Sequence, residues 1–289
     1  MPVYELKAAI PVALVDQAEE LLAELEEQRL MVLEDKPSAQ AWVAGYFDSN
    51  EDALGTWKVF VEVAGAEWAK MKPEVRELPD VDWKESYKAH FKASKFGRLN
   101  WVPVWERETF VLPKGEEVLW LDPGMAFGTG NHETTRLCCE RLARHAELNG
   151  NAAKVIDAGC GSGILALSAA KLGFRDICGF DNDAEAIRVS CENAELNGLS
   201  GKVDFYVGDL VTGLAAREAG LVMANIQADV LMCFSNELCA AVVPSGELVL
   251  SGILAHELDR IRTKFAAVTK TWAIDSRTLG EWADLSLRR

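Results

Sequence analysis

The sequence predicts an α/β protein with a mostly parallel sheet whose last strand is antiparallel, preceded by a smaller α+β domain. Strands and helices alternate regularly from Thr134 onward, which is typical of β-α-β units on a parallel sheet. A glycine-rich loop follows one of the buried strands, and only three residues separate the last two strands. Connections this short join antiparallel neighbours.

The chain of 289 residues is long enough for two compact domains. The segment Pro-Asp-Val-Asp at 79–82 interrupts the pattern of strands and helices. It is followed by a lysine-bearing helical stretch at 83–94. We therefore predict an N-terminal domain over residues 1–79, a linker helix over 80–95 and a larger domain over 96–289.

The N-terminal domain has the predicted order strand, helix, strand, strand, helix, strand. Apolar residues recur with helical spacing over 12–29, among many glutamates. Ser49, with Asp52 three residues later, is a capping box that begins the second helix. This order is typical of a ferredoxin-like fold. The four predicted strands cover residues 3–6, 30–33, 41–47 and 75–78.

The larger domain ends in a predicted hairpin instead of a further strand-helix-strand unit. After a helix at 256–265, the segments 272–277 and 281–287 are joined only by Thr278-Leu279-Gly280. This hairpin predicts a final strand antiparallel to the rest of the sheet. We therefore expect a Rossmann-like sheet of the class I methyltransferase type rather than that of a dinucleotide dehydrogenase.

The first strand of this alternation leads into the loop D-A-G-C-G-S-G at 157–163. Glycines let the backbone turn tightly and approach a ligand closely. The helix that begins at Ile164 presents free N–H groups and a positive dipole end to a carboxylate. Asp157 can bind the amino group of a cofactor or hold the loop in place. We expect Asp157, Gly159 and Gly161 to form part of a nucleoside cofactor site.

The glycine spacing separates two candidate cofactors. A dinucleotide site expects G-x-G-x-x-G, whereas this loop has G-x-G-x-G. Asp181 lies 22 residues beyond Gly159, at the end of the next strand, where a carboxylate can bind both ribose hydroxyls. The combination favours S-adenosylmethionine over NAD.

Polar residues also follow the later strands. Asn225 ends the fourth strand and faces the crevice at the carboxyl ends of the sheet, where its amide can orient an incoming amine. Asp209 ends the third strand, and it either meets the adenine or is a solvated turn residue. In the loop 121–135, Thr135 is one of three threonines that can bind the cofactor's carboxylate. His132, taken alone, is more typical of a capping residue than of a catalytic base.

Charge and cysteine usage limit the partners. The formal net charge is −15, whereas nucleic-acid binding needs many Lys and Arg side chains, so we expect no direct nucleic-acid binding. Residues 1–72 carry 14 acidic and 6 basic side chains, a net charge of −8 that suits a lysine-rich protein. The seven cysteines show no C-x-x-C spacing, which predicts reduced thiols, a cytoplasmic protein and no metal site. No apolar run approaches the ~20 residues that span a bilayer, so we expect no membrane contact.

Four motifs together resemble the ribosomal protein L-eleven (L11) methyltransferases (PrmA). They are D-P-G-M-A-F-G-T-G-N-H-E-T-T at 122–135, V-I-D-A-G-C-G-S-G-I-L-A at 155–166, A-N-I-Q-A-D-V-L at 224–231 and S-G-I-L at 251–254. The F-G-T-G-x-H block is specific to this family and its near relatives, whereas the glycine loop is shared by class I enzymes at large. The first 78 residues match only in architecture.

The resemblance implies that Thr135, Gly159, Asp181 and Asn225 contact S-adenosylmethionine. It also implies that the N-terminal domain recognises ribosomal protein L11 and swings on the linker to present several amines. The product is then methylated lysine, and in some members a methylated N-terminal amine. Asn131 stands where relatives often carry Thr or His.

Methyl transfer to an amine requires the neutral amine. A free lysine has a pKa near 10.4, and both desolvation and the sulfonium charge of the cofactor lower it. We therefore expect positioning by Asn225 and backbone carbonyls to suffice, with no obligate base. The alternatives are a class I methyltransferase acting on another protein, RNA or a small molecule, a binding module with a decayed cofactor pocket, and a dehydrogenase.

Overall fold

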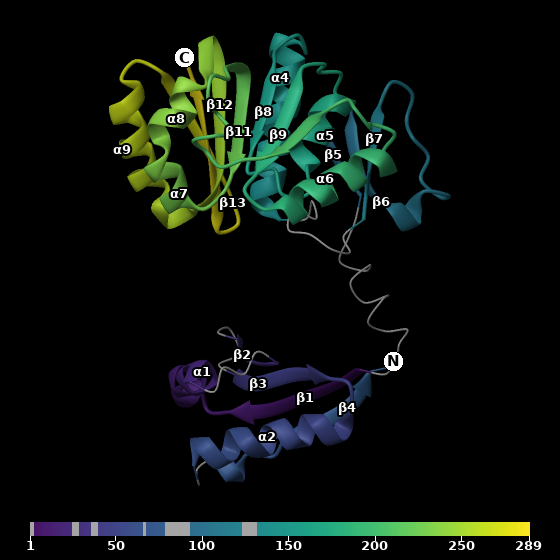
Figure 1. Cartoon of the computed structure of the whole chain (residues 1–289), viewed down its shortest axis with the longest axis vertical. Helices are drawn as coiled ribbons and strands as arrows, with labels where there is room; N and C mark the ends of the chain where they lie inside the picture. Colours follow the sequence, from purple (N-terminus) through teal and green to yellow (C-terminus); the bar gives the residue numbers. More distant parts are fainter. Residues whose placement is uncertain (1–2, 25–28, 36–39, 66–67, 79–92, 123–131) are drawn as a thin grey trace. The chain divides into compact units, whose positions relative to one another are not determined.

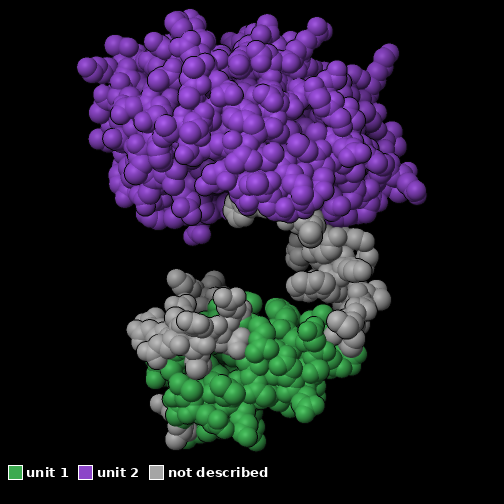
Figure 2. Space-filling model, viewed as in Figure 1, with its two compact units in different colours: residues 1–90 green, residues 91–289 purple. Residues whose placement is uncertain are grey.

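The computed structural model shows a chain that divides into two compact units, residues 1–90 and 91–289 (Figure 2). It describes residues 3–24, 29–35, 40–65, 68–78, 93–122 and 132–289. Most of the predicted linker helix, and the predicted boundary at residue 79, lie outside the described residues. The end of that prediction is wrong, because Ser94 and Lys95 belong to a strand of the second unit, where they pair with Trp101 and Asn100.

The first unit is a four-stranded antiparallel sheet with the strand order β2-β3-β1-β4. The sheet and its two helices enclose one apolar core, in which Phe60 and Trp68 are fully buried. Ser49 caps the second helix by accepting a hydrogen bond from Asp52 N (3.1 Å), as the capping box predicts. The elements are β1 (Val3–Ile10), α1 (Val15–Glu24), β2 (Leu30–Asp35), β3 (Gln40–Phe47), α2 (Asn50–Ala64) and β4 (Glu74–Leu78).

The second unit contains a seven-stranded sheet with the order β10-β9-β8-β11-β12-β14-β13. The first five strands in that order run parallel, and β14 runs antiparallel to both of its neighbours. The predicted α/β class and the antiparallel last strand are therefore confirmed. The strands are β8 (Val155–Ala158), β9 (Ile177–Asp181), β10 (Asp204–Val207), β11 (Ala219–Asn225), β12 (Val242–Leu254), β13 (Ala273–Leu279) and β14 (Trp282–Arg288).

Helices cover both faces of this sheet (Figure 1). Two apolar clusters, one on each face, bury the central strands completely, as is typical of parallel sheets. One face carries α4 (Glu133–Asn149), α5 (Ile164–Lys171) and α6 (Ala184–Leu196), and the other carries α7 (Ala228–Cys233), α8 (Ser235–Ala240) and α9 (Leu258–Thr269). No helix among the described residues is both long and apolar enough to cross a membrane.

A small sheet extends the face that α5 covers. Its strands are β5 (Ser94–Phe96), β6 (Leu99–Pro103) and β7 (Glu117–Leu121). The fully buried Trp101 fixes this sheet to α5, because its Nε1 donates a hydrogen bond to Ser168 Oγ (2.9 Å). Short 3-10 helices lie at Val12–Leu14, Trp68–Lys70, Val104–Glu106 and Ala255–Glu257.

A buried ion cluster attaches α4 to the terminal hairpin. Asp284 in β14 is fully buried and accepts hydrogen bonds from Arg141 Nε (3.0 Å) and Nη2 (2.7 Å). It also accepts from Arg277 Nη2 (2.6 Å) and from the Arg277 backbone N–H (3.0 Å). Burying the Asp284 carboxylate removes it from water, which costs free energy. The hydrogen bonds from Arg141 and Arg277 compensate this cost only while both arginines are in place.

We expect Asp284→Ala to lower the free energy of unfolding by about 3–5 kcal/mol, because it removes the buried carboxylate shared by Arg141 and Arg277 and leaves the buried Arg141 guanidinium with only the half-exposed Asp275 as its counter-charge. Urea unfolding followed by circular dichroism measures the loss. The matched control is Glu192→Ala, which breaks an exposed ion pair with Arg188 and should cost no more than about 1 kcal/mol. Equal losses in the two variants would contradict a special role for the buried cluster.

Candidate functional site

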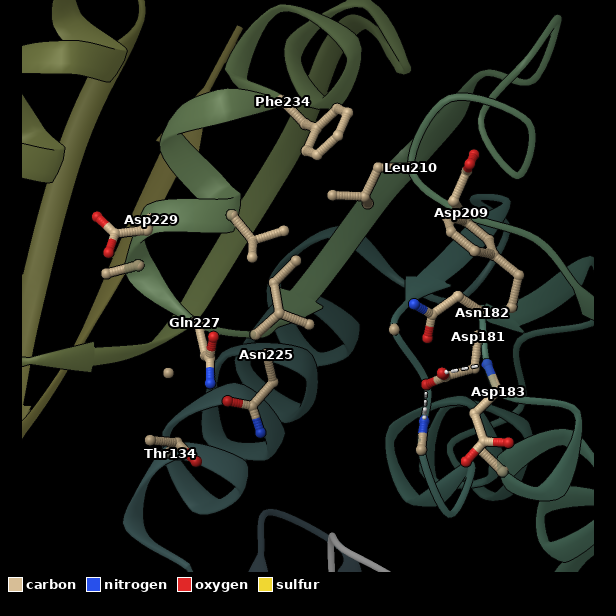
Figure 3. Close-up of a pocket in the computed structure, with 18 of the residues that line it drawn as sticks. Thr134, Asp181, Asn182, Asp183, Asp209, Leu210, Asn225, Gln227, Asp229 and Phe234 are labelled. Carbon is tan, nitrogen blue, oxygen red and sulfur yellow. Dashed lines mark hydrogen bonds between the residues drawn. The ribbon is translucent and has the colours of Figure 1, made fainter. Parts of the chain in front are cut away.

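A cavity of about 1040 Å³ opens at the carboxyl ends of the parallel strands. Four of the six residues that the sequence predicts for the site line it, namely Gly159, Gly161, Asp181 and Asn225. Figure 3 shows Asp181 and Asp209 on one side of the cavity and Asn225 on the other. Ligands of open α/β sheets bind in this crevice, where the strand order reverses.

The glycine loop reaches the cavity through a close backbone contact. Gly159 has φ +72°, and a Cβ at this position would lie 2.6 Å from Ile226 Cγ2. The loop ends at Gly163, which precedes the first turn of α5 in the left-handed region. The N–H groups at a helix start, together with the missing Cβ of Gly159, suit a carboxylate-bearing cofactor, although Ala166 N in that turn already donates to Asp157.

Asp181, at the end of the neighbouring strand β9, binds the backbone of the glycine loop. Its Oδ2 accepts a hydrogen bond from Gly161 N (2.9 Å) and its Oδ1 accepts one from Asp183 N (3.1 Å), as the dashed lines in Figure 3 mark. Each carboxylate oxygen has a further lone pair, so both can still accept a hydroxyl proton from the cavity. The two backbone hydrogen bonds thus hold the carboxylate in one orientation at the cavity wall.

Asp157 lies beneath the loop and is absent from the residues that line the cavity. Its side chain is buried, and Oδ2 accepts a hydrogen bond from Ala166 N (3.0 Å) in the first turn of α5. Burial, and to a smaller extent the nearby Asp181 charge, raise the pKa of this carboxyl from 3.8 to about 7, although the hydrogen bond from Ala166 N acts in the opposite direction. Of the two roles that the sequence leaves open for Asp157, the geometry matches the one that holds the loop.

Thr135 also lies behind the cavity wall. It is buried in the first turn of α4, and its Oγ1 accepts a hydrogen bond from Asn225 Nδ2 (3.2 Å). This bond uses one of the two N–H groups of the Asn225 amide and fixes the orientation of the amide, whose oxygen is available to accept a hydrogen bond from a ligand. The neighbouring Thr134, which the sequence does not distinguish from Thr135, is the one that lines the cavity.

His132 has the capping role expected of it. Its Nδ1 accepts a hydrogen bond from Thr134 N (3.4 Å) at the start of α4. The imidazole also packs edge-on against Trp282 of β14, with 4.8 Å between the ring centroids. Both rings line the cavity. The other residues of the second loop, 123–131, lie outside the described residues.

Asp209 matches the turn alternative, although it also lines the cavity. Its Oδ1 accepts hydrogen bonds from Thr212 N (2.7 Å) and Val211 N (2.9 Å). These bonds, of which those from Thr212 contribute most, hold the pKa of the carboxyl below its usual value. No cluster of three or more His, Cys, Asp or Glu side chains suited to a metal occurs in the part of the chain that the structure describes.

Sequence reasoning missed several residues of the cavity, above all Gly252 and Gln227. Gly252 has φ +82°, and a Cβ there would lie 2.3 Å from the carbonyl oxygen of Ile226. It occupies a bulge where the pairing of β12 with β14 shifts between Leu250 and Ile253. A glycine inside a buried strand is the one sequence signal that marks this position.

A parallel sheet with an antiparallel last strand, a glycine loop and an acidic residue at the end of the next strand define a class I methyltransferase that uses S-adenosylmethionine. The family model of ribosomal protein L11 methyltransferase (PrmA) matches residues 5–289, and the chain belongs to this family. The family resemblance seen in the motifs is thereby confirmed.

Individual relatives agree with this assignment. The chain is 34% identical over 309 residues to the ribosomal protein L11 methyltransferase of Geobacter sp. (strain M21), covering 99% of this chain and 97% of the relative. It is 35% identical over 303 residues to that of Geobacter metallireducens, covering 97% and 96%. A solved structure of the ribosomal protein L11 methylase from Lactobacillus delbrueckii subsp. bulgaricus is 31% identical with a TM-score of 0.59, covering 69% of this chain and 99% of that one.

We expect Gly252→Ala to destabilise the second unit by about 1–3 kcal/mol, because the added Cβ clashes with Ile226 and the backbone is strained at this φ. S-adenosylmethionine should also bind more weakly, since Ile226 packs against Gly159. Thermal unfolding and calorimetric titration measure the two effects. Gly55→Ala is the control, because a Cβ at that helical position meets no atom within 4 Å; a Gly252→Ala protein as stable as wild type would contradict the contact.

The raised pKa of Asp157 predicts a pH-dependent stability. Between about pH 4 and about pH 7 the folded protein holds a proton on Asp157 that the unfolded chain releases, so the wild type loses stability as pH rises through this window. Asp157→Asn can accept the hydrogen bond from Ala166 N but does not titrate. The free energy of unfolding of wild type minus that of the variant should therefore fall across this range and level off above it. A difference independent of pH would show that Asp157 is ionised throughout.

Proposed function

We propose that this protein transfers methyl groups from S-adenosylmethionine to lysine amines of ribosomal protein L11, in the cytoplasm. The observation that supports it most directly is that one cavity is lined both by residues suited to the cofactor and by a residue suited to the acceptor amine. Asp181 and the glycine loop suit the cofactor, and the amide oxygen of Asn225 faces the same space. The printed names of the relatives supply the identity of the protein substrate.

The residues of the cavity fit this cofactor chemically. Asp181 accepts hydrogen bonds from the two ribose hydroxyls, and the N–H groups at the start of α5 bind the carboxylate of the methionyl part. Gly159 and Gly161 leave room for the cofactor against the loop. S-adenosylmethionine supplies a methyl group bound to a positively charged sulfur.

Asn225 orients the acceptor in this proposal. Its amide oxygen accepts a hydrogen bond from the amine and directs the nitrogen lone pair toward the methyl group. A neutral amide stabilises the ammonium form less than a carboxylate does, so the amine loses its proton to water more readily beside Asn225 than it would beside an aspartate. The enzyme then needs no dedicated base.

The N-terminal domain, residues 1–79, recognises ribosomal protein L11 in this proposal. Its acidic excess favours a lysine-rich protein over a nucleic acid as the partner. The relatives match this chain over nearly its whole length, including this domain.

Methylation assays with radiolabelled S-adenosylmethionine test the proposal. Purified ribosomal protein L11 and purified ribosomal RNA are offered separately to the protein, and we expect label only in L11. Mass spectrometry then locates the methyl groups on lysines. Label in the RNA, or in neither substrate, would contradict the proposed acceptor, and the RNA result would favour an RNA methyltransferase on the same fold.

Two variants separate cofactor binding from acceptor orientation. Asp181→Ala should raise the Kd for S-adenosylmethionine at least tenfold, because hydrogen bonds to a charged group contribute about 1.5–3 kcal/mol. Asn225→Ala should leave that Kd within about twofold and lower kcat about 100-fold, since it misplaces the amine rather than the cofactor.

Calorimetry and steady-state kinetics give the two readouts. The control is Asn236→Ala, which removes an exposed amide of α8 outside the cavity and should change neither. Unchanged turnover in Asn225→Ala would exclude the orienting role of Asn225.

A further inference from the structure

Gln227 lies next to Asn225 on the cavity wall, and neither the fold nor the cofactor accounts for it. It follows β11 and occupies the N-cap position of α7, yet its side chain makes no capping hydrogen bond to that helix. The residue is exposed and lines the cavity. Figure 3 shows the amides of Gln227 and Asn225 side by side, on the other side of the cavity from Asp181. The Gln227 amide is therefore directed at the acceptor side of the cavity rather than at its own helix.

The two amides differ in how they are held. The nitrogen of Asn225 is bound to Thr135, so the oxygen of Asn225 is fixed in place. Gln227 has one more rotatable bond and can bring its own oxygen toward the same ligand atom. The cavity wall thus offers two carbonyl oxygens from side chains.

A neutral primary amine has two N–H groups and one lone pair. A single acceptor leaves the amine free to rotate about the N–H bond that it engages, whereas two acceptors determine the direction of the lone pair. Once the nitrogen carries a methyl group, its neutral form has only one N–H left. The second acceptor then has no donor to bind.

We propose that Gln227 orients the unmethylated acceptor amine together with Asn225, and so accelerates the first methyl transfer to each lysine more than the second. The inference rests on the proposed function. In the first transfer the N–C bond forms, the C–S bond breaks with its electron pair going to sulfur, and the resulting secondary ammonium releases one proton to water. Gln227 accepts an N–H hydrogen bond and exchanges no proton.

The test follows the unmethylated, monomethylated and dimethylated forms of each modified lysine of ribosomal protein L11 by mass spectrometry over time. The time course gives the rate constants of the first and second transfer. In Gln227→Leu, which has a similar size but no acceptor, we expect the first rate constant to fall about tenfold. We expect the second to fall less than about twofold, so that the ratio of the two decreases.

Two further variants make the result specific. Gln227→Glu keeps acceptor oxygens and should retain at least half of the wild-type ratio. Asn236→Leu makes the corresponding amide-to-leucine change on the exposed surface of α8 and should alter neither rate constant. Calorimetric titration should give the wild-type Kd for S-adenosylmethionine in all three, and circular dichroism checks that each is folded.

Equal losses in the two rate constants of Gln227→Leu, or no loss in the first, would overturn the assignment. A raised Kd for S-adenosylmethionine would also overturn it, because Gln227 would then belong to the cofactor site. Failure of the proposed function itself is recognised separately, in the wild-type arm: a wild-type protein that binds the cofactor but leaves L11 unmethylated refutes the substrate, whatever the variants do.

Discussion

The contact of Ile226 with two glycines controls the geometry of the whole cavity. Ile226 follows β11, which lies between β8 and β12, and Gly159 and Gly252 come from the ends of those two neighbours. A Cβ at either glycine would collide with Ile226, so the three strand ends converge only because both positions lack one. The glycine loop after β8 and Asn225 at the end of β11 are therefore positioned by the same contact.

The two sides of the cavity also differ in chemistry. Asp181 and Asp209 follow the strands on the side formed by β9 and β10, and the neutral amides of Asn225 and Gln227 lie on the side of β11. Asp229 and Glu257 also line the cavity, and Arg260 pairs with both of these carboxylates. Hydroxyl groups of a ribose are good donors to a carboxylate. A lysine amine, by contrast, must lose a proton before it reacts, and an adjacent carboxylate would raise its pKa. The amide side thus suits the acceptor and the acidic side suits the nucleoside.

Buried charges support this arrangement from outside the cavity. Asp284 and its two arginines join α4 to the terminal hairpin, and the first turn of α4 carries Thr135, which holds Asn225. The same hairpin contributes Trp282, which packs against His132 at the start of α4. The antiparallel last strand consequently does more than complete the sheet. It fixes the helix end that positions the acceptor amide.

The sequence by itself determined the class of fold, and it placed the glycine loop and Asp181 at the ends of two successive strands. These features depend on local signals: the period of apolar residues, the glycine spacing and the place of a charged residue at a strand end. The terminal hairpin, predicted over 272–277 and 281–287, followed from the same signals. The linker prediction extended too far, because the short strand at Ser94–Phe96 forms only through pairing with β6.

Only the tertiary structure decided that Asp157 and Thr135 lie behind the cavity wall, and that Thr134, Gly252 and Gln227 lie on it. Neighbouring residues such as Thr134 and Thr135 have the same chemistry, and the direction of a side chain at a helix end depends on the strand that packs beside it. A glycine is needed at position 252 because Ile226, the residue after β11, lies against it, so nothing in the segment around Gly252 shows the requirement. Contacts between strands that are distant in sequence decide which side chains line the cavity and which ones support them from behind. The residue types alone do not decide this.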